Sequence, residues 1–397
     1  MSIDLPAGSP PARVPFYNDP KVRSIAYQVA LCALVALGVY VAATNAIANL
    51  ARAHIASGFG FWRNTAGFDI SQTLIEYSSQ ASTYGRAFWV GLLNTLLVAG
   101  LGIVIATVLG FVIGIARLSK NWLVSKAATG YVETIRNIPL LLQLLFWYNA
   151  VLKGLPELRD GYKIPGGIFL NNRGLFVPEP VFATPFKWVV FAVIFGILAS
   201  IAYSIWARKH QERTGQQTPV FWVALALIVG LPLIALAGAG FPLSFVFPEG
   251  GRFNITGGIE MLPEFAALLF GLSIYTAAFI AEVVRAGIGA VSQGQTEAAY
   301  SLGLRPRPTL RLIVVPQAMR VIIPPLTSQY LNLTKNSSLA VAIGYPDLVQ
   351  VFTGTVLNQT GQAVEVVAIT MAVYLTISLA TSLLMNFYNS RIALVER

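Results

Sequence analysis

Eight stretches of this chain are strongly apolar and carry few charges. They cover residues 24–45, 87–116, 137–152, 188–207, 220–237, 265–288, 321–343 and 366–388. A helix of about 20 apolar residues crosses the ~30 Å hydrocarbon core of a bilayer, and a helix satisfies its own backbone hydrogen bonds there. The pattern therefore predicts an all-α polytopic membrane protein with about eight transmembrane helices. The surrounding lipid is its first expected partner.

The low charge content supports this class and excludes others. Only 11% of the residues are charged, against roughly 25% in a soluble domain. The net charge of +10 raises the question of nucleic acid, but no basic run with interleaved aromatics is present, so we expect no nucleic-acid partner. Cys32 is the only cysteine, and His54 and His210 have no ligand-like neighbours, so we expect no metal site.

The sequence offers no constellation for catalysis. Neither histidine is placed beside a nucleophile and an orienting acid, so no catalytic residue is expected and a membrane enzyme is disfavoured. A GxxxxGK[ST] phosphate loop is missing from the sequence, which means that any ATP used must be bound by another chain. No cofactor is therefore expected in this chain.

Lysine and arginine predict the orientation in the membrane. Basic residues follow the second and fourth apolar stretches and surround residues 289–320, whereas the 344–365 loop has Asp347 and Glu365 and no basic residue. This places 344–365 outside and both termini in the cytoplasm. Residues 1–23 are rich in proline and polar groups, which predicts a mobile cytoplasmic tail and not a cleaved signal peptide.

The polar stretch 292–309 lies between the sixth and seventh apolar stretches. Ser292 and Gln295 have the spacing of a capping box, and Gly303 is placed as a left-handed C-terminal cap. Pro306 and Pro308 are expected to prevent the helix from resuming. The stretch predicts a short rigid helix that another protein can grip. An ordinary connecting helix is the alternative.

This stretch resembles the EAA loop of membrane subunits of binding-protein-dependent ABC importers. The likeness is carried by Glu297-Ala298-Ala299, Gly303 and the IVVP block at 313–316, and GQ at 294–295, SLGL at 301–304 and PQAMR at 316–320 narrow it to the polar amino acid branch. In that family the loop forms the coupling helix, which sits in a cleft of the cytoplasmic ATPase. The resemblance implies coupling roles for Glu297, Ala298, Ala299, Ser301, Gly303, Leu304 and Arg305.

Further blocks extend the resemblance to the five-helix core of type I importers. They are GLLNT at 91–95, the block around Arg136, Pro139 and Gln143, and the sixth stretch with Tyr275, Glu282 and Arg285. The expected regions are a cytoplasmic tail (1–23), a first transmembrane helix with a long periplasmic loop (24–86), the first segment of the permease core (87–152), an inserted loop and helical hairpin (153–262), the second segment of the permease core with the EAA loop at 292–320 (263–390) and a cytoplasmic C-terminus (391–397).

The regions outside this core are additions. They are similar to those of the first membrane subunit of general L-amino-acid permeases, which also handle glutamate, glutamine, aspartate and asparagine. The glycine, proline and aromatic content of 46–86 and 153–187 indicates folded surface instead of linker. Residues 58–62 and 66–69 either pack against each other, lie on the membrane surface or contact an external partner.

A lysine in the seventh apolar stretch is the main candidate for contact with substrate. Charged groups inside a span usually face the bundle interior or water. Lys335 can replace water around a carboxylate together with neighbouring hydroxyls. The family typically has Lys-Asp-Thr-Ser here, and Asn336 removes the acid, which puts in doubt a role of position 336 in binding an ammonium. The predicted substrate pathway comprises Thr334, Lys335, Asn336, Ser337, Ser338, Tyr275 and Gln143.

Structural pairing is the alternative for these charges. Lys335 would then pair with Glu282 or Glu133 of the same or a partner subunit. Glu133 and Arg136, like Glu282 and Arg285, stand three apart, so each pair is expected to share a helix face and neutralise itself at a structural or interface position. Pro139 and Pro316 are expected to shape helices. Gly110 and Gly114 indicate a close helix contact.

The resemblance implies a permease subunit of an ATP-driven importer of polar L-amino acids in the bacterial inner membrane. The subunit would form half of the translocation pathway and couple to the ATPase through 292–309. Expected partners are a second homologous permease subunit in a heterodimer, an ABC ATPase dimer that holds Mg-ATP, and a periplasmic amino-acid-binding protein. The alternative is a self-contained secondary amino acid transporter or channel, which predicts internal repeats that we do not find.

Overall fold

The computed structural model describes residues 20–52, 57–251 and 254–392. The expected tail lies mostly outside this range, as do residues 393–397. Within it, seven helices are long and apolar enough to cross a membrane, or up to eight if one bent pair counts as a span, which agrees with the expected number. Six of them correspond to α1 (Pro20–Arg52), α2 (Tyr84–Arg117), α5 (Phe186–Thr214), α8 (Pro263–Gly289), α11 (Val315–Asn336) and α13 (Ala363–Ile392), and the seventh candidate is Val220–Gly238.

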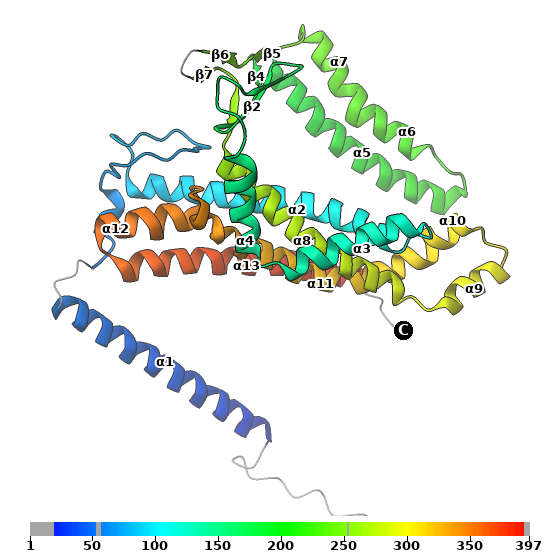
Figure 1. Cartoon of the computed structure of the whole chain (residues 1–397). Helices are drawn as coiled ribbons and strands as arrows, with labels where there is room; N and C mark the ends of the chain where they lie inside the picture. The colour runs from blue at the N-terminus through cyan, green and yellow to red at the C-terminus, as the bar shows by residue number, and fades with distance from the viewer. Residues whose placement is uncertain (1–19, 53–56, 252–253, 393–397) are drawn as a thin grey trace, which may run out of the picture.

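The bundle core forms where α2 and α8 cross (Figure 1). Glycine permits this contact, because a Cβ on Gly110 would lie 2.5 Å from Cγ2 of Ile280 and one on Gly114 would lie 2.8 Å from the carbonyl oxygen of Ala281. Leu268, Leu272 and Leu333 fill the space between the helices. The expected glycine contact is confirmed.

The third apolar stretch is not one straight helix. α3 (Trp122–Asn137) is followed by α4 (Leu140–Leu145) and the π-helix η3 (Phe146–Leu152), with a bend of 104° between α3 and α4. Pro139 causes the break, because it lacks an N–H and keeps Ile138 extended. Nε2 of Gln143 donates to the carbonyl oxygens of Ile135 and Ile138, both at 2.9 Å, and so satisfies groups that the break frees.

Helical structure that continues into the seventh span begins at Pro306, whereas the sequence predicted a span from residue 321. α9 (Gln293–Ser301) ends at Gly303, and α10 (Pro306–Thr309), the π-helix η5 (Leu310–Val314), α11 and the 3-10 helix η6 (Ser337–Ile343) follow. The expectation that Pro306 blocks a helix was wrong, because a proline in the first turn needs no N–H partner. The π-turn of η5 precedes Pro316, which stands near the start of α11.

The segment 344–365, expected as a loop, is largely helical. It contains η7 (Val349–Val356, a π-helix) and α12 (Leu357–Thr360). The 3-10 turn η2 (Gly60–Arg63) packs on it, and the ring of Trp62 lies 5.2 Å from that of Phe88 and 5.9 Å from that of Phe352. These aromatics form a second hydrophobic core. Aromatic residues of 58–69 thus pack on α2 and η7, a contact that none of the three alternatives named.

The insertion contains strands that an all-α protein was not expected to have. They are β1 (Tyr162–Ile164), β2 (Ile168–Asn171), β3 (Gly174–Val177), β4 (Glu179–Phe182), β5 (Leu243–Val246), β6 (Glu249–Gly250), β7 (Ile255–Thr256) and β8 (Ile259–Met261). Short β-rich runs between glycine turns explain them. The chain as a whole remains predominantly helical.

The strands close the base of the inserted hairpin. β1-β2-β3-β8 form one antiparallel sheet, and β4 pairs with β5. The strands before the hairpin (β1–β4) are thus joined to those after it (β5 and β8), and together they form a platform of strands. The hairpin consists of α5, α6 (Val220–Leu225), the π-helix η4 (Ala226–Gly230) and α7 (Leu231–Gly238), and it projects from this platform beside the bundle (Figure 1).

Candidate functional site

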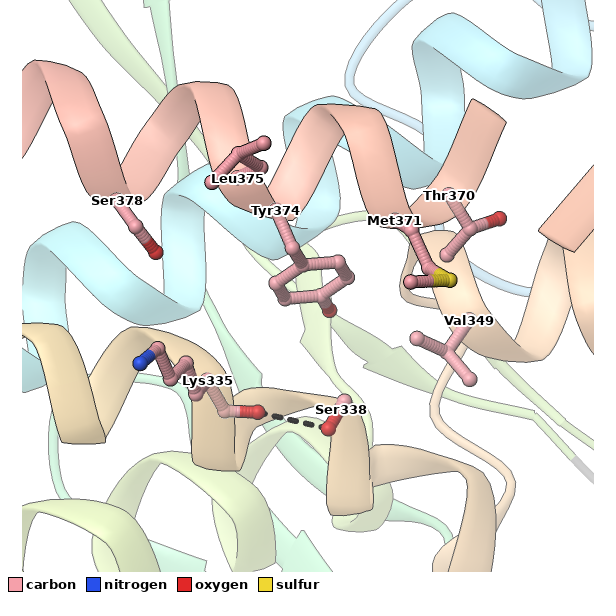
Figure 2. Close-up of a pocket in the computed structure, with 8 residues that line it drawn as sticks. All are labelled: Lys335, Ser338, Val349, Thr370, Met371, Tyr374, Leu375 and Ser378. Atoms are coloured by element: carbon pink, nitrogen blue, oxygen red, sulfur yellow. Dashed lines mark hydrogen bonds between the residues drawn. The ribbon is translucent and has the colours of Figure 1, made fainter. Parts of the chain in front are cut away.

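A groove of about 520 Å³ lies between α11–η6 and α13. Figure 2 shows Lys335 and Ser338 on one wall and the residues of α13 on the other. We call it the Lys335 groove. Its lining residues are Lys335, Ser338, Val349, Thr370, Met371, Tyr374, Leu375 and Ser378.

The first wall forms where α11 changes into the 3-10 helix η6. Thr334 and Ser337 turn into the protein, where their hydroxyls donate to the carbonyl oxygens of Tyr330 (2.9 Å) and Thr334 (2.8 Å). Ser338 donates to the carbonyl oxygen of Lys335 at 2.7 Å. Of the five pathway residues predicted at 334–338, Lys335 and Ser338 therefore line the groove.

Lys335 is exposed and has no carboxylate partner among the described residues. The alternative in which it pairs with Glu282 or Glu133 of the same chain is not found, because arginines contact both of those carboxylates. A lysine that faces lipid in the middle of a span costs at least ~2.5 kcal/mol. The groove must therefore face water or another protein chain.

The second wall carries a row of hydroxyls on one face of α13. Thr370, Tyr374 and Ser378 follow one another at intervals of four residues. The Tyr374 hydroxyl donates to Oδ2 of Asp347 at 3.1 Å. Figure 2 shows the phenol reaching from α13 towards the opposite wall.

Asp347 is fully buried behind this phenol. Its Oδ1 accepts the backbone N–H of Gln350 at 2.8 Å, so the carboxylate also caps the start of the helix that follows. Burial raises the pKa of Asp347 to about 7, and the hydrogen bonds from Gln350 and Tyr374 oppose this rise. Both carboxylate oxygens are thus engaged.

The GLLNT block of α2 holds the turn that carries Asp347. Nδ2 of Asn94 donates to the carbonyl oxygen of Pro346 at 2.8 Å, and Thr95 Oγ1 accepts the N–H of Leu348 at 3.0 Å. A Cβ on Gly91 would lie 3.0 Å from Cα of Leu348. This block, which sequence reasoning assigned only by resemblance, positions one side of the groove.

Sequence reasoning missed Tyr374 as a groove residue and Asp347 as the buried acid behind it. Asp347 served only as an outer-loop charge in the topology argument. The signal that would have found Tyr374 is the polar residue at every fourth position of the otherwise apolar stretch 366–388.

Two further predicted pathway residues lie away from the groove. Gln143 is buried at the bend between α3 and α4, where both of its amide contacts go to backbone carbonyls. The ring of Tyr275 packs on that of Phe279 at 4.9 Å. Their part in the substrate pathway stays a prediction, as does that of Asn336, which is half-buried beside Lys335.

The predicted coupling helix α9 projects from one end of the bundle (Figure 1). Ala299 is 1% exposed and anchors it, whereas Glu297, Ala298 and Ser301 are exposed and Leu302 is 82% exposed. Leu304 and Arg305 follow at its end, half-buried and exposed. The coupling role of α9 stays a prediction.

Gly303 ends α9 as predicted, whereas the predicted capping box does not form. The φ of Gly303 is 76°, and the N–H of Leu304 reaches the carbonyl oxygen of Ala299 at 3.0 Å. The Ser292 side chain makes no cap hydrogen bond, since the N–H of Gln295 donates to the Ser292 carbonyl oxygen at 3.1 Å. The Gln295 side chain accepts from Nε2 of Gln317 at 3.2 Å. This contact ties α9 to the start of α11.

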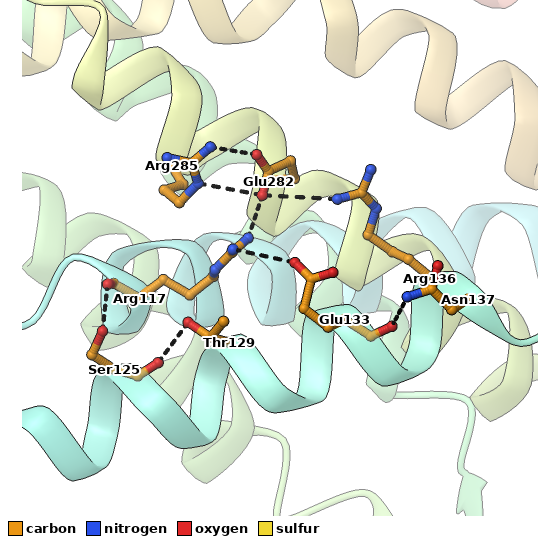
Figure 3. Close-up of polar contacts among 8 residues, drawn as sticks. All are labelled: Arg117, Ser125, Thr129, Glu133, Arg136, Asn137, Glu282 and Arg285. Carbon is orange, nitrogen blue, oxygen red and sulfur yellow. Dashed lines mark hydrogen bonds and ion pairs between the residues drawn. The ribbon is translucent and has the colours of Figure 1, made fainter.

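A cluster of charges joins α2, α3 and α8 near the same end (Figure 3). The Glu282 carboxylate accepts from Arg117 and from Arg285, the latter at 2.5 Å, and lies 3.9 Å from Arg136. Arg117 also lies 3.8 Å from Glu133. The Glu282–Arg285 pair is confirmed, but the expected Glu133–Arg136 pair was wrong, because each contacts a residue of another helix instead.

Comparison with known proteins gives full-length relatives. The family model described as "binding-protein-dependent transport system inner membrane component" matches residues 213–394. The general L-amino acid transport system permease protein AapQ of Rhizobium johnstonii is 56% identical over 379 residues, 96% of this chain and 94% of that protein. The putative amino-acid ABC transporter permease protein YhdX of Escherichia coli is 53% identical over 382 residues, 96% of this chain and 97% of that protein.

A third relative has a more specific name. The glutamate/glutamine/aspartate/asparagine transport system permease protein BztB of Rhodobacter capsulatus is 45% identical over 411 residues, which cover 96% of each chain. All three alignments extend across the insertion that carries the strands and the helical hairpin.

Proposed function

The chain belongs to the family of binding-protein-dependent inner membrane transport components and is a permease subunit of an ABC importer, and we propose that it carries polar L-amino acids across the bacterial inner membrane. The names of the full-length relatives support this substrate class, since they refer to general L-amino acids, to amino acids and to glutamate, glutamine, aspartate and asparagine. A self-contained secondary transporter is not favoured.

The Lys335 groove is the observation that supports a substrate pathway in this chain. An exposed lysine faces a row of hydroxyls inside the span, and the groove is open along the surface of the chain. Such a polar face cannot lie against lipid. A second permease subunit closes it in our proposal, so that each subunit supplies half of the pathway. A homologous but different chain is the partner that the family pattern favours.

Coupling to ATP takes place at the opposite end of α11. α9 offers Glu297, Ala298 and Ser301 to a cytoplasmic ATPase dimer, which binds Mg-ATP and supplies the energy. The ion-pair cluster around Glu282 links α8 to α2 and α3, so that a displacement of α9 moves these helices together. The permease chain itself supports import without being an enzyme.

The cycle is alternating access. A periplasmic amino-acid-binding protein delivers the substrate at the outer end, where much of the 57–83 segment and most of strands β1, β4, β5 and β6 are exposed. ATP-driven closure of the ATPase dimer then moves the helices and turns the Lys335 groove from one side of the membrane to the other. The substrate biases this cycle only through unequal affinity for the two states.

The test is reconstitution of the chain with its co-purifying partners in proteoliposomes. We expect uptake of labelled L-glutamine and L-glutamate only with internal ATP and external binding protein. Mass spectrometry of the purified complex is expected to show an ATPase and a second permease chain. Uptake without ATP by the chain alone would contradict the proposal in favour of a secondary transporter.

A further inference from the structure

The described lining of the Lys335 groove has a cation but no carboxylate. An L-amino acid carries an ammonium beside its carboxylate, and both groups lose water when it enters the groove. Asn336 stands where the resembling family typically has an acid, so position 336 offers no charge for the ammonium. The balancing negative charge must come from elsewhere.

We propose that Tyr374, held by Asp347, accepts the α-ammonium of an L-amino acid whose α-carboxylate is bound by Lys335. The inference deepens the proposed function and rests on it. It makes Tyr374 a substrate-contacting residue and Asp347 a positioning residue that acts through the phenol.

The direction of the hydrogen bond between Tyr374 and Asp347 determines what the phenol can bind. A phenol has one donor and can also accept. While Asp347 is ionised, the proton of Tyr374 points to its Oδ2 at 3.1 Å. The hydroxyls of Ser337 and Thr95 also contact the phenol oxygen, but they donate to the carbonyl oxygens of Thr334 and Gly91, so the lone pairs of Tyr374 stay open to an incoming donor. A hydroxyl that can only accept suits an ammonium and rejects a carboxylate. Polarisation by the buried acid strengthens it as an acceptor.

Asp347 does not meet the substrate itself. It is fully buried, and its two oxygens already accept from Tyr374 and from the Gln350 backbone. This separation keeps Lys335 free, because an aspartate in the groove would pair with it. The turn bonded to Asn94 and Thr95 fixes the acid behind the phenol.

The remaining lining fits recognition of the backbone groups of many amino acids. The groove volume of about 520 Å³ lies within the range of ~300–1,000 Å³ that is usual for small-molecule sites. Val349, Met371 and Leu375 supply apolar surface without a further charge. Methionine adapts to differently shaped side chains, so these residues tolerate variation beyond the α-carbon.

The experiment measures binding of labelled L-glutamine to the whole permease–ATPase complex in nanodiscs at pH 8, where Asp347 is ionised, without the binding protein. Glutaramic acid, which lacks the ammonium, and 4-aminobutanamide, which lacks the carboxylate, compete with it. We expect Tyr374→Phe and Asp347→Asn each to weaken L-glutamine binding about 10- to 100-fold, the range for one hydrogen bond to a charged group. Both variants should leave the affinity for glutaramic acid unchanged.

The double variant is expected to bind L-glutamine as weakly as either single variant, because both residues act through one hydroxyl. Lys335→Met is expected to weaken L-glutamine and glutaramic acid but not 4-aminobutanamide. Tyr131→Phe is the matched control, since Tyr131 lies on α3 outside the groove and its hydroxyl donates to the carbonyl oxygen of Ile274. It should bind all three ligands like the wild type.

Equal weakening of all three ligands by Tyr374→Phe would indicate a merely structural role and would overturn the inference. Unchanged L-glutamine binding in Tyr374→Phe and Asp347→Asn would place the ammonium site on another chain and would overturn it as well. A wild-type complex that imports L-glutamine with ATP yet shows no saturable binding refutes the subsite alone. Failure of ATP-driven import by the wild type refutes the proposed function itself.

Discussion

Arg117 at the end of α2 donates to the Glu282 carboxylate of α8, although the two residues lie 165 positions apart in the chain. The Arg117 side chain is only 8% exposed, and Glu282 also contacts Arg136 and Arg285. One carboxylate therefore compensates arginines on three helices. Glu282 lies about two turns before the end of α8, and the polar stretch that contains α9 follows that helix in the chain.

Glu282→Gln is expected to destabilise the complex strongly. The change leaves the buried Arg117 without its charged acceptor. The positive charges of the neighbouring arginines are then no longer balanced by a carboxylate at position 282. The expected loss is roughly 2–4 kcal/mol, in the range for breaking a partly buried ion pair. Thermal unfolding of the detergent-solubilised complex measures it. Glu133→Gln is the control, because Glu133 contacts the same Arg117 at 3.8 Å but is 58% exposed, and it should cost less than ~1 kcal/mol. Equal effects of the two changes would contradict the role of Glu282.

Gly303→Val is expected to abolish amino acid uptake while the protein still inserts. A Cβ on Gly303 meets nothing within 4 Å, but the φ of 76° strains a β-branched residue by at least ~1–2 kcal/mol, and the end of α9 must shift. Glu297→Lys should have the same effect through its exposed charge. Parallel assays of ATP hydrolysis and uptake in proteoliposomes measure the loss of coupling.

Gly289→Val is the control for this prediction. Gly289 ends α8, has equally open space at its Cβ and does not have a positive φ. Its uptake should stay near the wild-type level. Normal uptake in Gly303→Val and Glu297→Lys would count against α9 as the coupling helix.

Gly114→Ala is expected to destabilise the α2–α8 contact. Its Cβ would lie 2.8 Å from the carbonyl oxygen of Ala281, and backbone cannot move aside as a flexible side chain does. Overpacking of this kind costs about 1–3 kcal/mol. Gly100→Ala on the same helix meets nothing within 4 Å and should stabilise the chain slightly through its better helix propensity. Thermal unfolding compares the two, and a Gly114→Ala variant as stable as Gly100→Ala would refute the close contact.

Sequence reasoning succeeded where local chemistry decides the structure. Long apolar runs place α2, α8 and α13, and the lack of a Cβ on Gly303 permits its left-handed cap. It failed at Pro306, because proline stops a helix in the interior and starts one in the first turn, and the sequence alone does not say which position it takes.

Partners distant in the chain were harder to predict than helices. Spacing predicted that Glu133 and Arg136 pair, but Arg117 and Glu282 offered better partners once α2, α3 and α8 had packed. In the same way, the contact of Asp347 with Tyr374 depends on the turn held by Asn94. No periodicity within one segment reveals a bond of this kind.

Asp347 is expected to make the stability of the protein depend on pH. Burial raises its pKa from the ordinary 3.8 to about 7, so between these values the folded chain holds a proton that the unfolded chain has lost. Stability therefore falls as the pH rises from about 4 to about 7 and levels off above the folded-state pKa. The other ionisable groups that act on Asp347 are Tyr345 and Tyr374, phenols that stay neutral at these pH values.

Asp347→Asn should remove this dependence, because the amide keeps the shape without an ionisable group. Its single oxygen can accept from only one of Gln350 and Tyr374. We expect the melting temperature of the wild type to fall between pH 5 and pH 8 relative to that of Asp347→Asn, by roughly 2 °C or more. Melting curves from pH 5 to pH 8.5 measure it, and Glu133→Gln should keep the wild-type profile. A parallel pH profile for Asp347→Asn and the wild type would contradict the prediction. A carboxylate that destabilises the fold at neutral pH requires a functional reason, and the acceptor that it prepares on Tyr374 supplies one.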